Sequence, residues 1–467
     1  MCRSAPGVSM LLASARRGNH ARRPTRRSPR PPGSRLRARV QGSVSEPIAV
    51  EPRGPLDADV RLPGSKSLSN RALVVATLAE GRSRLEGLLQ SDDIEVMRRA
   101  VGALGAEVCA EAGDVWTVTG TGGRLRAPAD TLDVRASGTA ARFLTALATL
   151  APGPSTIDGI PRLRERPIED LTEALTRLGA QVEARGPGGC APVHVRGGGL
   201  GGGETDVDAR RSSQTVSALL LVAPLAQRDV RLHLLEGTLV SRPYVDVTLQ
   251  VMEAFGANAG WEDDVTLFVR AAGPYTARSY RIEPDASTAA YFLSAAAVAG
   301  GRVHVAGLSP DSRQADVGLL GVLERMGCGV EPEAGGVTLR GPGDGLVGVD
   351  VDMNAMPDAV LALAVVAAFA KGPTRIRNVA HLRIKESDRL AALATELRKL
   401  GCEAREHEDG LEIRPGSLRG AEIDTYGDHR MAMAFAMAGL QVPGVRIRNP
   451  EVVSKSWPKY FEALAGL

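Results

Sequence analysis

The sequence predicts an α/β protein of two domains, each built from three repeated strand/helix units in which one helix is buried. Three observations support this prediction. A polar-then-apolar segment occurs six times, an amphipathic helix recurs between these segments, and short β-rich stretches follow the amphipathic helices. A regular repeat of this kind is typical of an assembly of similar units. With 467 residues, the chain is long enough for two domains of ordinary size.

Each polar-then-apolar segment begins with a helix-capping residue and continues as a run that is apolar on nearly all sides. The first residues are spaced 68 to 76 positions apart and are Ser69, Ser137, Ser213, Asp285, Asp358 and Asp428. Ser and Asp accept hydrogen bonds from the free N–H groups of a first helical turn, and a helix that is apolar all round is buried. We therefore expect six buried helices. An extended helical solenoid is the alternative, which the interleaved strands disfavour.

The amphipathic helices each end in an apolar residue, a glycine and a small residue, with the glycines at positions 105, 179, 256, 327 and 401. Their polar faces predict outer helices. The sixth unit is cut short at Tyr460–Leu467, while Pro47–Leu62 has the pattern of strands with no helix before them. We expect these two pieces to complete one domain, formed by residues 46–64 and 284–467. Residues 65–283 form the second domain, and the buried helices point their N-termini into the cleft between the domains.

The net charge of +3 is unevenly distributed. Residues 1–45 contain 11 arginines, no lysine and no acidic residue, which leaves 46 basic and 54 acidic residues in 46–467. The composition of 1–45 predicts a disordered tail. A dispensable tail or upstream start is the favoured interpretation, and an organelle transit peptide and a nucleic-acid-binding arm are the alternatives. The rest of the chain gives no reason to expect nucleic acid as a partner.

Apolar runs and cysteines indicate the compartment. The run Ala359–Ala370 is too short to cross a membrane, so we expect no membrane partner. The five cysteines are scattered without the close pairing of a metal or redox motif, which favours a reduced, cytoplasmic location. Organelle import by the tail is the alternative.

Polar residues concentrate where the buried helices begin. The segment Leu62–Arg71 brings Lys66, Ser67 and Arg71 to the start of an apolar helix, and helix N-termini favour anions because their N–H groups are unpaired and the dipole is positive there. Similar groups stand at the other helix starts: Ser137, Gly138, Thr139, Arg142, Ser212, Ser213, Gln214, Arg166, Lys385, Arg389, Arg430 and Lys455. Several fixed cations predict a ligand with more than one anionic group.

Three carboxylates, Asp358, Glu386 and Asp428, stand among these cations. Carboxylates are poor neighbours for an anionic ligand unless they handle protons or orient cations. The alternative for Asp358 and Asp428 is a simple N-cap, and Asp285 is expected to be one. No P-loop, nucleophile elbow or zinc-binding pair is present in the sequence, so we expect catalysis without a metal or cofactor.

The motifs LPGSKSLSNRA at 62–72, RIKESDR at 383–389 and GDHRMAMA at 427–434 strongly resemble the 5-enolpyruvylshikimate-3-phosphate (EPSP) synthase family. The segments at 165–168, 212–214, 240–244 and 454–461 occur in the family's order, and the resemblance covers roughly residues 47–465. It implies an inside-out α/β barrel, the enolpyruvyl transferase fold. It also implies transfer of the enolpyruvyl group of phosphoenolpyruvate to the 5-hydroxyl of shikimate 3-phosphate through a tetrahedral ketal intermediate, with phosphate released.

The resemblance also implies which residues bind each substrate. Those expected to hold shikimate 3-phosphate are Lys66, Ser67, Arg71, Ser212, Ser213, Gln214, Ser241, Tyr244, Asp358, His381 and Lys385. Those expected to hold phosphoenolpyruvate are Lys66, Gly138, Arg166, Gln214, Arg389, Arg430 and Lys455. Proton transfer is assigned to Lys66, Asp358 and Glu386 together, without a division of steps.

Three positions depart from the family's common pattern: Ala136 replaces an Asn, Phe143 replaces Pro or Leu, and His381 stands where some members have Asn. Gly138 leaves space for glyphosate, a phosphoenolpyruvate analogue, so the resemblance implies sensitivity to it.

The related transferase acting on UDP-N-acetylglucosamine is the alternative enzyme, but none of the cysteines lies in the loop that carries its acid. Two further hypotheses assign no catalysis to the chain: a nucleic-acid-binding protein that uses the basic tail, and an inactive scaffold. Retention of Lys66, Glu386, Arg430 and Lys455 disfavours the scaffold. A closing two-domain cleft can work as a monomer, which we expect here.

Overall fold

The computed structural model describes residues 46–467, so the predicted disordered tail at 1–45 lies outside the described residues. From residue 46 onward the chain is an α/β structure with two hydrophobic cores. The first core contains side chains between Leu68 and Ile282, and the second contains Leu56 and side chains between Ala286 and Leu464. No helix in this described part is long and apolar enough to cross a membrane.

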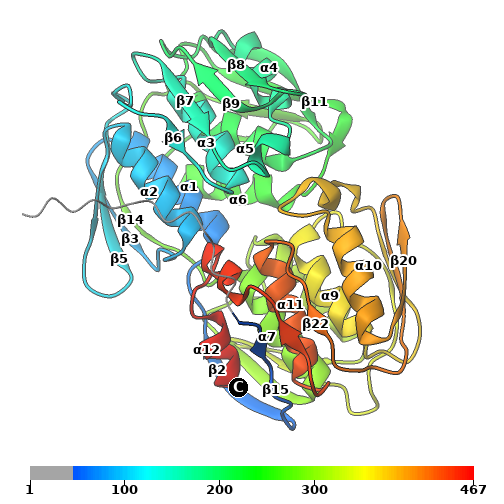
Figure 1. Cartoon of the computed structure of the whole chain (residues 1–467). Coiled ribbons are helices and arrows are strands. Elements are labelled where there is room, and N and C mark those ends of the chain that lie inside the picture. The colour runs from blue at the N-terminus through cyan, green and yellow to red at the C-terminus, as the bar shows by residue number, and fades with distance from the viewer. Residues whose placement is uncertain (1–45) are drawn as a thin grey trace, which may run out of the picture. The chain divides into compact units, whose positions relative to one another are not determined.

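Three helices are buried in each core and pack on one another, as the sequence predicts (Figure 1). In the first core they are α1 (Lys66–Leu78), α3 (Gly138–Ala148) and α5 (Ser213–Val222). In the second core they are α7 (Ala286–Ala299), α9 (Val360–Ala367) and α11 (His429–Gly439). The many alanines of α3, α7 and α11 leave room for this close approach of helix to helix.

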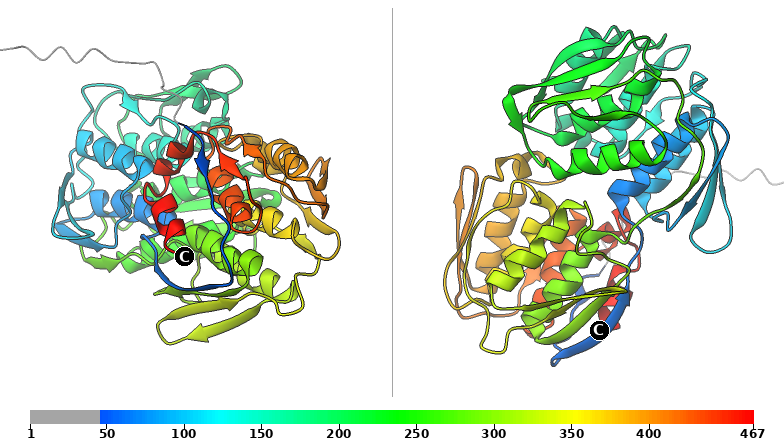
Figure 2. Two further views of the ribbon diagram at one scale, coloured as in Figure 1. Left: turned by 60° about the horizontal axis from the view of Figure 1, so that its bottom comes forward. Right: turned by 180° about the vertical axis from the view of Figure 1, so that it is seen from behind.

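Outer helices and short 3-10 turns cover the buried helices, and Figure 2 shows them from two further sides. The outer helices are α2 (Asp92–Ala103), α4 (Glu169–Arg177), α6 (Pro243–Ala254), α8 (Leu319–Arg325), α10 (Arg389–Leu400) and α12 (Tyr460–Ala465). The turns are η1 (Leu163–Glu165), η2 (Ala223–Leu225), η3 (Ala315–Gly318), η4 (Pro357–Ala359), η5 (Ala380–Ile384) and η6 (Pro450–Lys455). The α4 helix shows the amphipathic pattern, since it buries Leu171 and Leu175 and exposes Glu173.

Three of the predicted helix starts are correct and three are wrong. Ser137, Asp285 and Asp428 cap α3, α7 and α11 as predicted. Ser65, not Ser69, caps α1, and Ser212, not Ser213, caps α5. Asp358 caps nothing, because it lies inside η4. In α1 and α5 the first turn carries polar residues, so the apolar run begins after the helix does, whereas α9 begins at Val360, after the 3-10 turn that contains Asp358.

Five four-stranded sheets and one three-stranded sheet surround the buried helices of the described chain. In each, a first strand is parallel to a second, and the remaining strands continue antiparallel. The sheets of the first core are β14 (Ser279–Arg281), β3 (Arg82–Glu86), β5 (Val115–Thr119), β4 (Glu107–Ala110); β6 (Leu132–Asp133), β7 (Ser155–Asp158), β9 (Cys190–Val195), β8 (Val182–Gly186); and β10 (Gly203–Ala209), β11 (Val230–Leu239), β13 (Thr266–Val269), β12 (Ala259–Trp261). Those of the second are β2 (Leu56–Arg61), β15 (Gly301–Ala306), β17 (Gly336–Arg340), β16 (Gly329–Glu333); β18 (Asp350–Asp352), β19 (Thr374–Arg377), β21 (Gly410–Arg414), β20 (Glu403–His407); and β22 (Glu422–Ile423), β23 (Arg446–Ile447), β1 (Ile48–Ala49).

Two first strands are exchanged between the cores. Strand β2 precedes α1 in the chain but pairs with β15 of the second core, while β14 precedes α7 but pairs with β3 of the first. The chain therefore crosses between the cores twice, side by side, with the Ser65 N–H donating to the Glu283 carbonyl at 2.8 Å. A Cβ on Gly64 would lie 1.8 Å from the Gly87 carbonyl oxygen, so the crossing requires glycine there. The division of the chain into two domains at this crossing, and independent movement of the two parts, stay predictions.

Candidate active site

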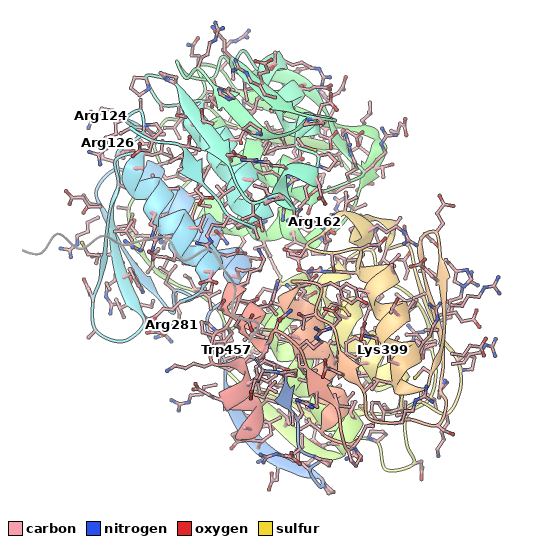
Figure 3. All side chains as sticks on the ribbon, viewed as in Figure 1. Arg124, Arg126, Arg162, Arg281, Lys399 and Trp457 are labelled. Carbon is pink, nitrogen blue, oxygen red and sulfur yellow. The ribbon has the colours of Figure 1, made fainter. Side chains whose placement is uncertain are left out.

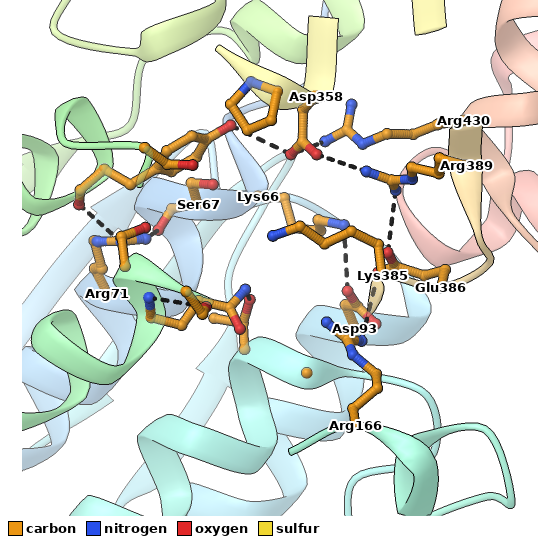
Figure 4. Close-up of a pocket in the computed structure, with 18 residues that line it drawn as sticks. Lys66, Ser67, Arg71, Asp93, Arg166, Asp358, Lys385, Glu386, Arg389 and Arg430 are labelled. Carbon is orange, nitrogen blue, oxygen red and sulfur yellow. Dashed lines mark hydrogen bonds and ion pairs between the residues drawn. The ribbon is translucent and has the colours of Figure 1, made fainter. Parts of the chain in front are cut away.

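One polar pocket lies where the N-terminal ends of helices from both cores meet (Figure 4). Its lining includes six cations and three carboxylates: Lys66, Arg71, Arg166, Lys385, Arg389, Arg430, Asp93, Asp358 and Glu386. Its other lining residues are Ser67, Gly138, Thr139, Ser212, Ser213, Gln214, Ser241, Tyr244 and Pro357. The excess of cations and the free N–H groups of several helix starts make the pocket suitable for a ligand with several anionic groups.

The Arg389 guanidinium is the centre of a buried ion-pair network. Its nitrogens lie 2.8 Å from Asp358, 2.8 Å from Asp428 and 3.1 Å from Glu386, and its side chain is 1% exposed. Arg430 adds a second contact to Asp358 at 2.7 Å. Burial raises the pKa of Asp358, but the charges of Arg430 and Arg389 outweigh it and hold the pKa below its usual range. The same balance, with Arg389, Arg166 and Lys455 as the cations, keeps the pKa of Glu386 well below normal. Both carboxyls are therefore ionised at neutral pH.

Asp93 at the start of α2 joins two lysines, one from each core. Lys66 lies 3.3 Å from one carboxylate oxygen and Lys455 lies 3.0 Å from the other. Lys455 also donates to the Ala136 carbonyl at 3.0 Å. Burial raises the pKa of Asp93, but the charges of Lys455 and Lys66 together have a larger effect and lower the pKa below its usual value. The carboxylate is therefore ionised. Sequence reasoning missed Asp93, because an acidic residue in a first helical turn is common wherever a helix begins.

The Arg166 guanidinium has nitrogen atoms that are available to bind an anion. Its Nε and Nη1 are buried and have no hydrogen-bond partner in the structure, and Nη1 lies 3.9 Å from the Glu386 carboxylate. Gly138 faces the guanidinium so closely that a Cβ there would lie 2.5 Å from its Nη2. The buried Arg142 side chain donates to the Gly138 carbonyl at 3.2 Å and also to the Pro167 carbonyl. Arg142 thereby fixes the backbone at Gly138 and the backbone next to Arg166.

Most N–H groups of the Arg71 guanidinium already donate hydrogen bonds within the protein. It donates to Thr248 Oγ1, the Ser67 carbonyl, Ser217 Oγ and the Tyr244 carbonyl at 2.7 to 3.2 Å. Burial lowers its pKa to about 10. The departure at Phe143 has a structural role here, because its ring packs 5.3 Å from the Arg71 guanidinium carbon. Arg71 has one Nη1 hydrogen left for a ligand, so it cannot grip a carboxylate with both arms in this conformation.

Lys385 and His381 have different positions. Lys385 lines the pocket, and burial lowers its pKa to about 8. His381 is buried outside the lining, its Nε2 has no partner, and burial lowers its pKa to about 3. Of the residues expected to bind substrate, His381 and Lys455 are the two outside the pocket lining, and Lys455 reaches the site through Asp93 and Glu386.

Polar contacts connect the two cores around the pocket. Arg162, labelled in Figure 3, donates to the Glu386 carbonyl at 3.1 Å and to the Lys385 carbonyl at 2.9 Å. The Ser241 N–H, on a residue with φ 57°, donates to Asn354 Oδ1 at 3.3 Å. Tyr244 Oη lies 3.2 Å from Asp358 Oδ2. The pocket thus depends on both cores, and the chain brings its parts together over more than a hundred residues.

Comparison with known proteins identifies the family. The model of the EPSP synthase (3-phosphoshikimate 1-carboxyvinyltransferase) family matches residues 50–464. The chain belongs to this family. An EPSP synthase relative, the 3-phosphoshikimate 1-carboxyvinyltransferase of Nostoc sp., is 45% identical over 408 residues, which are 87% of this chain and 96% of the relative. The enzyme of that name from Shewanella sp. strain ANA-3 is 44% identical over 90% of this chain and 99% of its own.

Solved structures agree with this EPSP synthase assignment. EPSP synthase from Acinetobacter baumannii has a TM-score of 0.75 at 28% identity, covering 90% of this chain and 97% of its own. The enolpyruvyl transferase NikO from Streptomyces tendae has a TM-score of 0.72 at 19% identity, covering 90% and 97%, which shows the fold alone. The predicted fold class, two sets of three strand/helix units with buried helices, is confirmed.

Proposed function

We propose that the pocket transfers the enolpyruvyl group of phosphoenolpyruvate to the 5-hydroxyl of shikimate 3-phosphate and releases phosphate. The observation that carries this proposal is the gathering of six cations around ionised carboxylates at the N-terminal ends of helices. Both substrates carry a phosphate and a carboxylate, which such a pocket suits. The alternative acceptor, UDP-N-acetylglucosamine, is not favoured by the family match.

The shikimate side is proposed to lie against α1, α5 and α6. Ser212, Ser213, Ser241 and Lys385 would hold the phosphate, with Ser67 and Gln214 beside them. Arg71 would donate its one free N–H to the carboxylate, and Tyr244 would pack beside the ring. Asp358 would accept a hydrogen bond from a ring hydroxyl. His381 would act only through Lys385 and Asp358, since it lies outside the pocket lining.

The phosphoenolpyruvate side is proposed to lie between α3 and α10. Arg166 supports this because its Nε and Nη1 have no partner and its neighbour Gly138 leaves the approach open. Arg389, Arg430, Lys66, Gln214 and Lys455 would supply the remaining donors. Lys455 and Lys66 share Asp93 as a counter-ion, so a bound phosphate would draw on two ammonium groups held in fixed positions.

The chemistry needs a donor and acceptors of protons. The methylene carbon takes a proton while the 5-hydroxyl oxygen attacks C2 and loses its own. The tetrahedral ketal phosphate then loses phosphate and a methyl proton, which restores the double bond. Asp358 and Glu386 are ionised and therefore suited to accept protons, and we assign donation to the Lys66 ammonium. Exclusion of water by closure of the two parts would strengthen each charge contact.

The decisive test measures phosphate release from phosphoenolpyruvate with shikimate 3-phosphate and UDP-N-acetylglucosamine as separate acceptors. The full chain and a 46–467 truncation are compared. Release with shikimate 3-phosphate alone supports the proposal, and equal rates in both proteins make residues 1–45 dispensable for catalysis. Release with the nucleotide sugar alone, or with neither acceptor in folded protein, overturns it.

Gly138→Ala is expected to raise KM for phosphoenolpyruvate about 10- to 100-fold, with a smaller change in kcat. The added methyl group would displace the Arg166 guanidinium, and loss of a charge-assisted hydrogen bond costs about 1.5–3 kcal/mol. The inhibition constant of glyphosate is expected to rise with it. Steady-state kinetics check this, with Gly102→Ala as the control, because a Cβ there meets nothing within 4 Å. Unchanged constants in Gly138→Ala would contradict the steric argument.

The ionisation of Lys385 predicts a pH dependence. Its pKa of about 8 in the free enzyme means that the ammonium is lost as the pH rises through 8. We expect kcat/KM for shikimate 3-phosphate to fall above that pH, since this parameter reports groups of the free enzyme. Lys385→Arg, which stays charged, should remove the part of the decline that is centred near pH 8. A decline at the same pH in this variant would assign it to another group.

A cytoplasmic monomer that binds no nucleic acid is the accompanying proposal, with organelle import by residues 1–45 as the alternative. Its support is that a single chain supplies the described pocket. Light scattering during size-exclusion chromatography measures the molecular mass, and the mass of a dimer would refute the proposal of a monomer. Nucleic-acid binding that falls steeply with salt and disappears on removal of 1–45 would show a function for the tail.

A further inference from the structure

A buried carboxylate lies directly behind Asp358, outside the pocket lining. Asp316 on η3 is 4% exposed, and its Oδ1 has no hydrogen-bond partner. Its Oδ2 contacts Ser287 Oγ at the start of α7 and lies 3.4 Å from Tyr244 Oη. The same Tyr244 oxygen lies 3.2 Å from Asp358 Oδ2. One tyrosine hydroxyl therefore faces two carboxyl groups.

The ionisation state of Asp316 determines which carboxyl group can receive the hydrogen bond of Tyr244. The Tyr244 hydroxyl has one proton and can donate it to Asp316 or to Asp358, but not to both. If both carboxyls are ionised, they compete for this proton, and one of the two contacts becomes an unfavourable approach of oxygens. If Asp316 is neutral, the Tyr244 proton is free for Asp358. The neutral acid also has a proton of its own for Tyr244 Oη or Ser287 Oγ.

The surroundings of Asp316 favour its neutral form. Burial and the nearby charge of Asp358 raise its pKa to about 7, and Asp285 raises it as well. Arg430 from α11 and the hydrogen bond from Ser287 act in the opposite direction. Tyr244 from α6 completes the set of ionisable groups that face it, and burial raises the pKa of that phenol well above normal. Asp358 has two guanidinium partners, whereas no ion pair involves Asp316 among the described residues.

We propose that Asp316 is a positioning residue for the reaction, which as a neutral acid leaves the Tyr244 hydroxyl proton to Asp358. The Tyr244–Asp358 hydrogen bond then fixes the Asp358 carboxylate, which would face a shikimate hydroxyl. It also fixes the Tyr244 side chain, which would pack beside the shikimate ring. Tyr244 belongs to the first core and both carboxyls to the second. The three groups therefore come into register only where the cores meet. The inference rests on the proposed roles of Asp358 and Tyr244.

Asp316→Asn separates the neutral form from the charged one. The amide has the shape of the neutral acid, can donate to Tyr244 Oη and cannot ionise. With both substrates saturating, wild-type kcat is expected to fall about threefold to tenfold as the pH rises from 6.5 to 8.5, since kcat reports ionisations of the bound enzyme. Asp316→Asn should keep the low-pH kcat throughout this range. Exposed Asp311→Asn in the same segment should follow the wild type.

Ser287→Ala adds a readout that a purely structural role would not change. The Ser287 hydrogen bond favours the ionised form of Asp316, so its removal should move the decline in kcat to higher pH. Two outcomes overturn the inference: an unchanged decline in Asp316→Asn, or loss of activity of that variant at every pH. The second would mean that the charged carboxylate is needed.

An infrared measurement keeps the inference testable apart from activity. The carbonyl band of a protonated carboxylic acid is expected in the folded full chain at pH 6, decreasing toward pH 8.5 and absent from Asp316→Asn. Its absence from the wild type overturns the inference whichever acceptor the enzyme uses. If shikimate 3-phosphate is not an acceptor, the proposed function fails, while the band still decides the ionisation of Asp316.

Discussion

Lys66→Met is expected to lower kcat by about 100- to 10,000-fold, the usual contribution of a general acid. Lys66 is the first residue of α1, and its ammonium lies 3.3 Å from Asp93 in the pocket. Asp358 and Glu386 cannot replace it as donors, because neighbouring cations keep both ionised. Methionine keeps the length of the side chain and removes its charge and its protons. Single-turnover kinetics with both substrates measure the chemical step directly.

Lys66→Arg distinguishes proton donation from charge. Guanidinium holds its proton far more tightly than ammonium, so this variant is expected to bind phosphoenolpyruvate nearly normally while kcat stays low. Asp93 keeps Lys455 as a partner in both variants, at 3.0 Å, so the fold should persist. Exposed Lys459→Met is the control and should match the wild type. If Lys66→Met keeps more than a tenth of wild-type kcat, another group donates the proton.

Arg389→Met is expected to lower the free energy of unfolding by about 3–5 kcal/mol at pH 7, the range for a broken buried ion pair. Asp358, Glu386 and Asp428 would lose their shared guanidinium in a site where Arg389 is 1% exposed. Urea unfolding without substrates, followed by circular dichroism, measures the change. Exposed Arg398→Met on the same helix loses only a hydrogen bond to the Ala404 carbonyl, with an expected cost of about 0.5–1.5 kcal/mol.

The effect of Arg389→Met should depend on pH in one direction. In the wild type the pKa values of Asp358 and Glu386 are lowered by folding. They therefore stabilise the protein above their unfolded pKa, which is about 4, and this contribution is lost as the pH falls. The difference between wild type and variant is expected to be largest at neutral pH and to shrink below pH 4. Equal stability at pH 7 would show that the network adds nothing to the fold.

The fold was largely predictable because its signals are long and repeated. Six apolar runs at similar spacing indicate six buried helices, and the structure confirms them. The start of α1 was not predictable from apolarity, because Lys66, Ser67 and Arg71 are polar residues on the helix itself. Arg71 is accommodated there by Thr248 and Ser217, which are distant in sequence. Short strands such as β1 and β22, with two residues each, have no pattern to detect.

The site was predictable where family motifs cover it and unpredictable where tertiary contacts create it. The motif residues Lys66, Arg389 and Arg430 all line one pocket. Asp93 and Asp316 lie outside those motifs and reach the site by packing, Asp93 through a contact with Lys455 that spans 362 positions. His381 is the converse case, since the family resemblance places it among the substrate-binding residues while packing leaves it outside the pocket lining.

The exchange of β2 and β14 has a consequence for the order in which the protein is made. The first core is complete once the ribosome has passed Ile282. Strand β2 must wait for β15, since Leu56 pairs with Gly301, and β1 must wait for Arg446. At roughly 5–20 residues per second, β2 spends at least ten seconds without its partner. The two earliest strands thus wait longest for their partners, and exposure of their edges during synthesis is where we expect misfolding of this chain to begin.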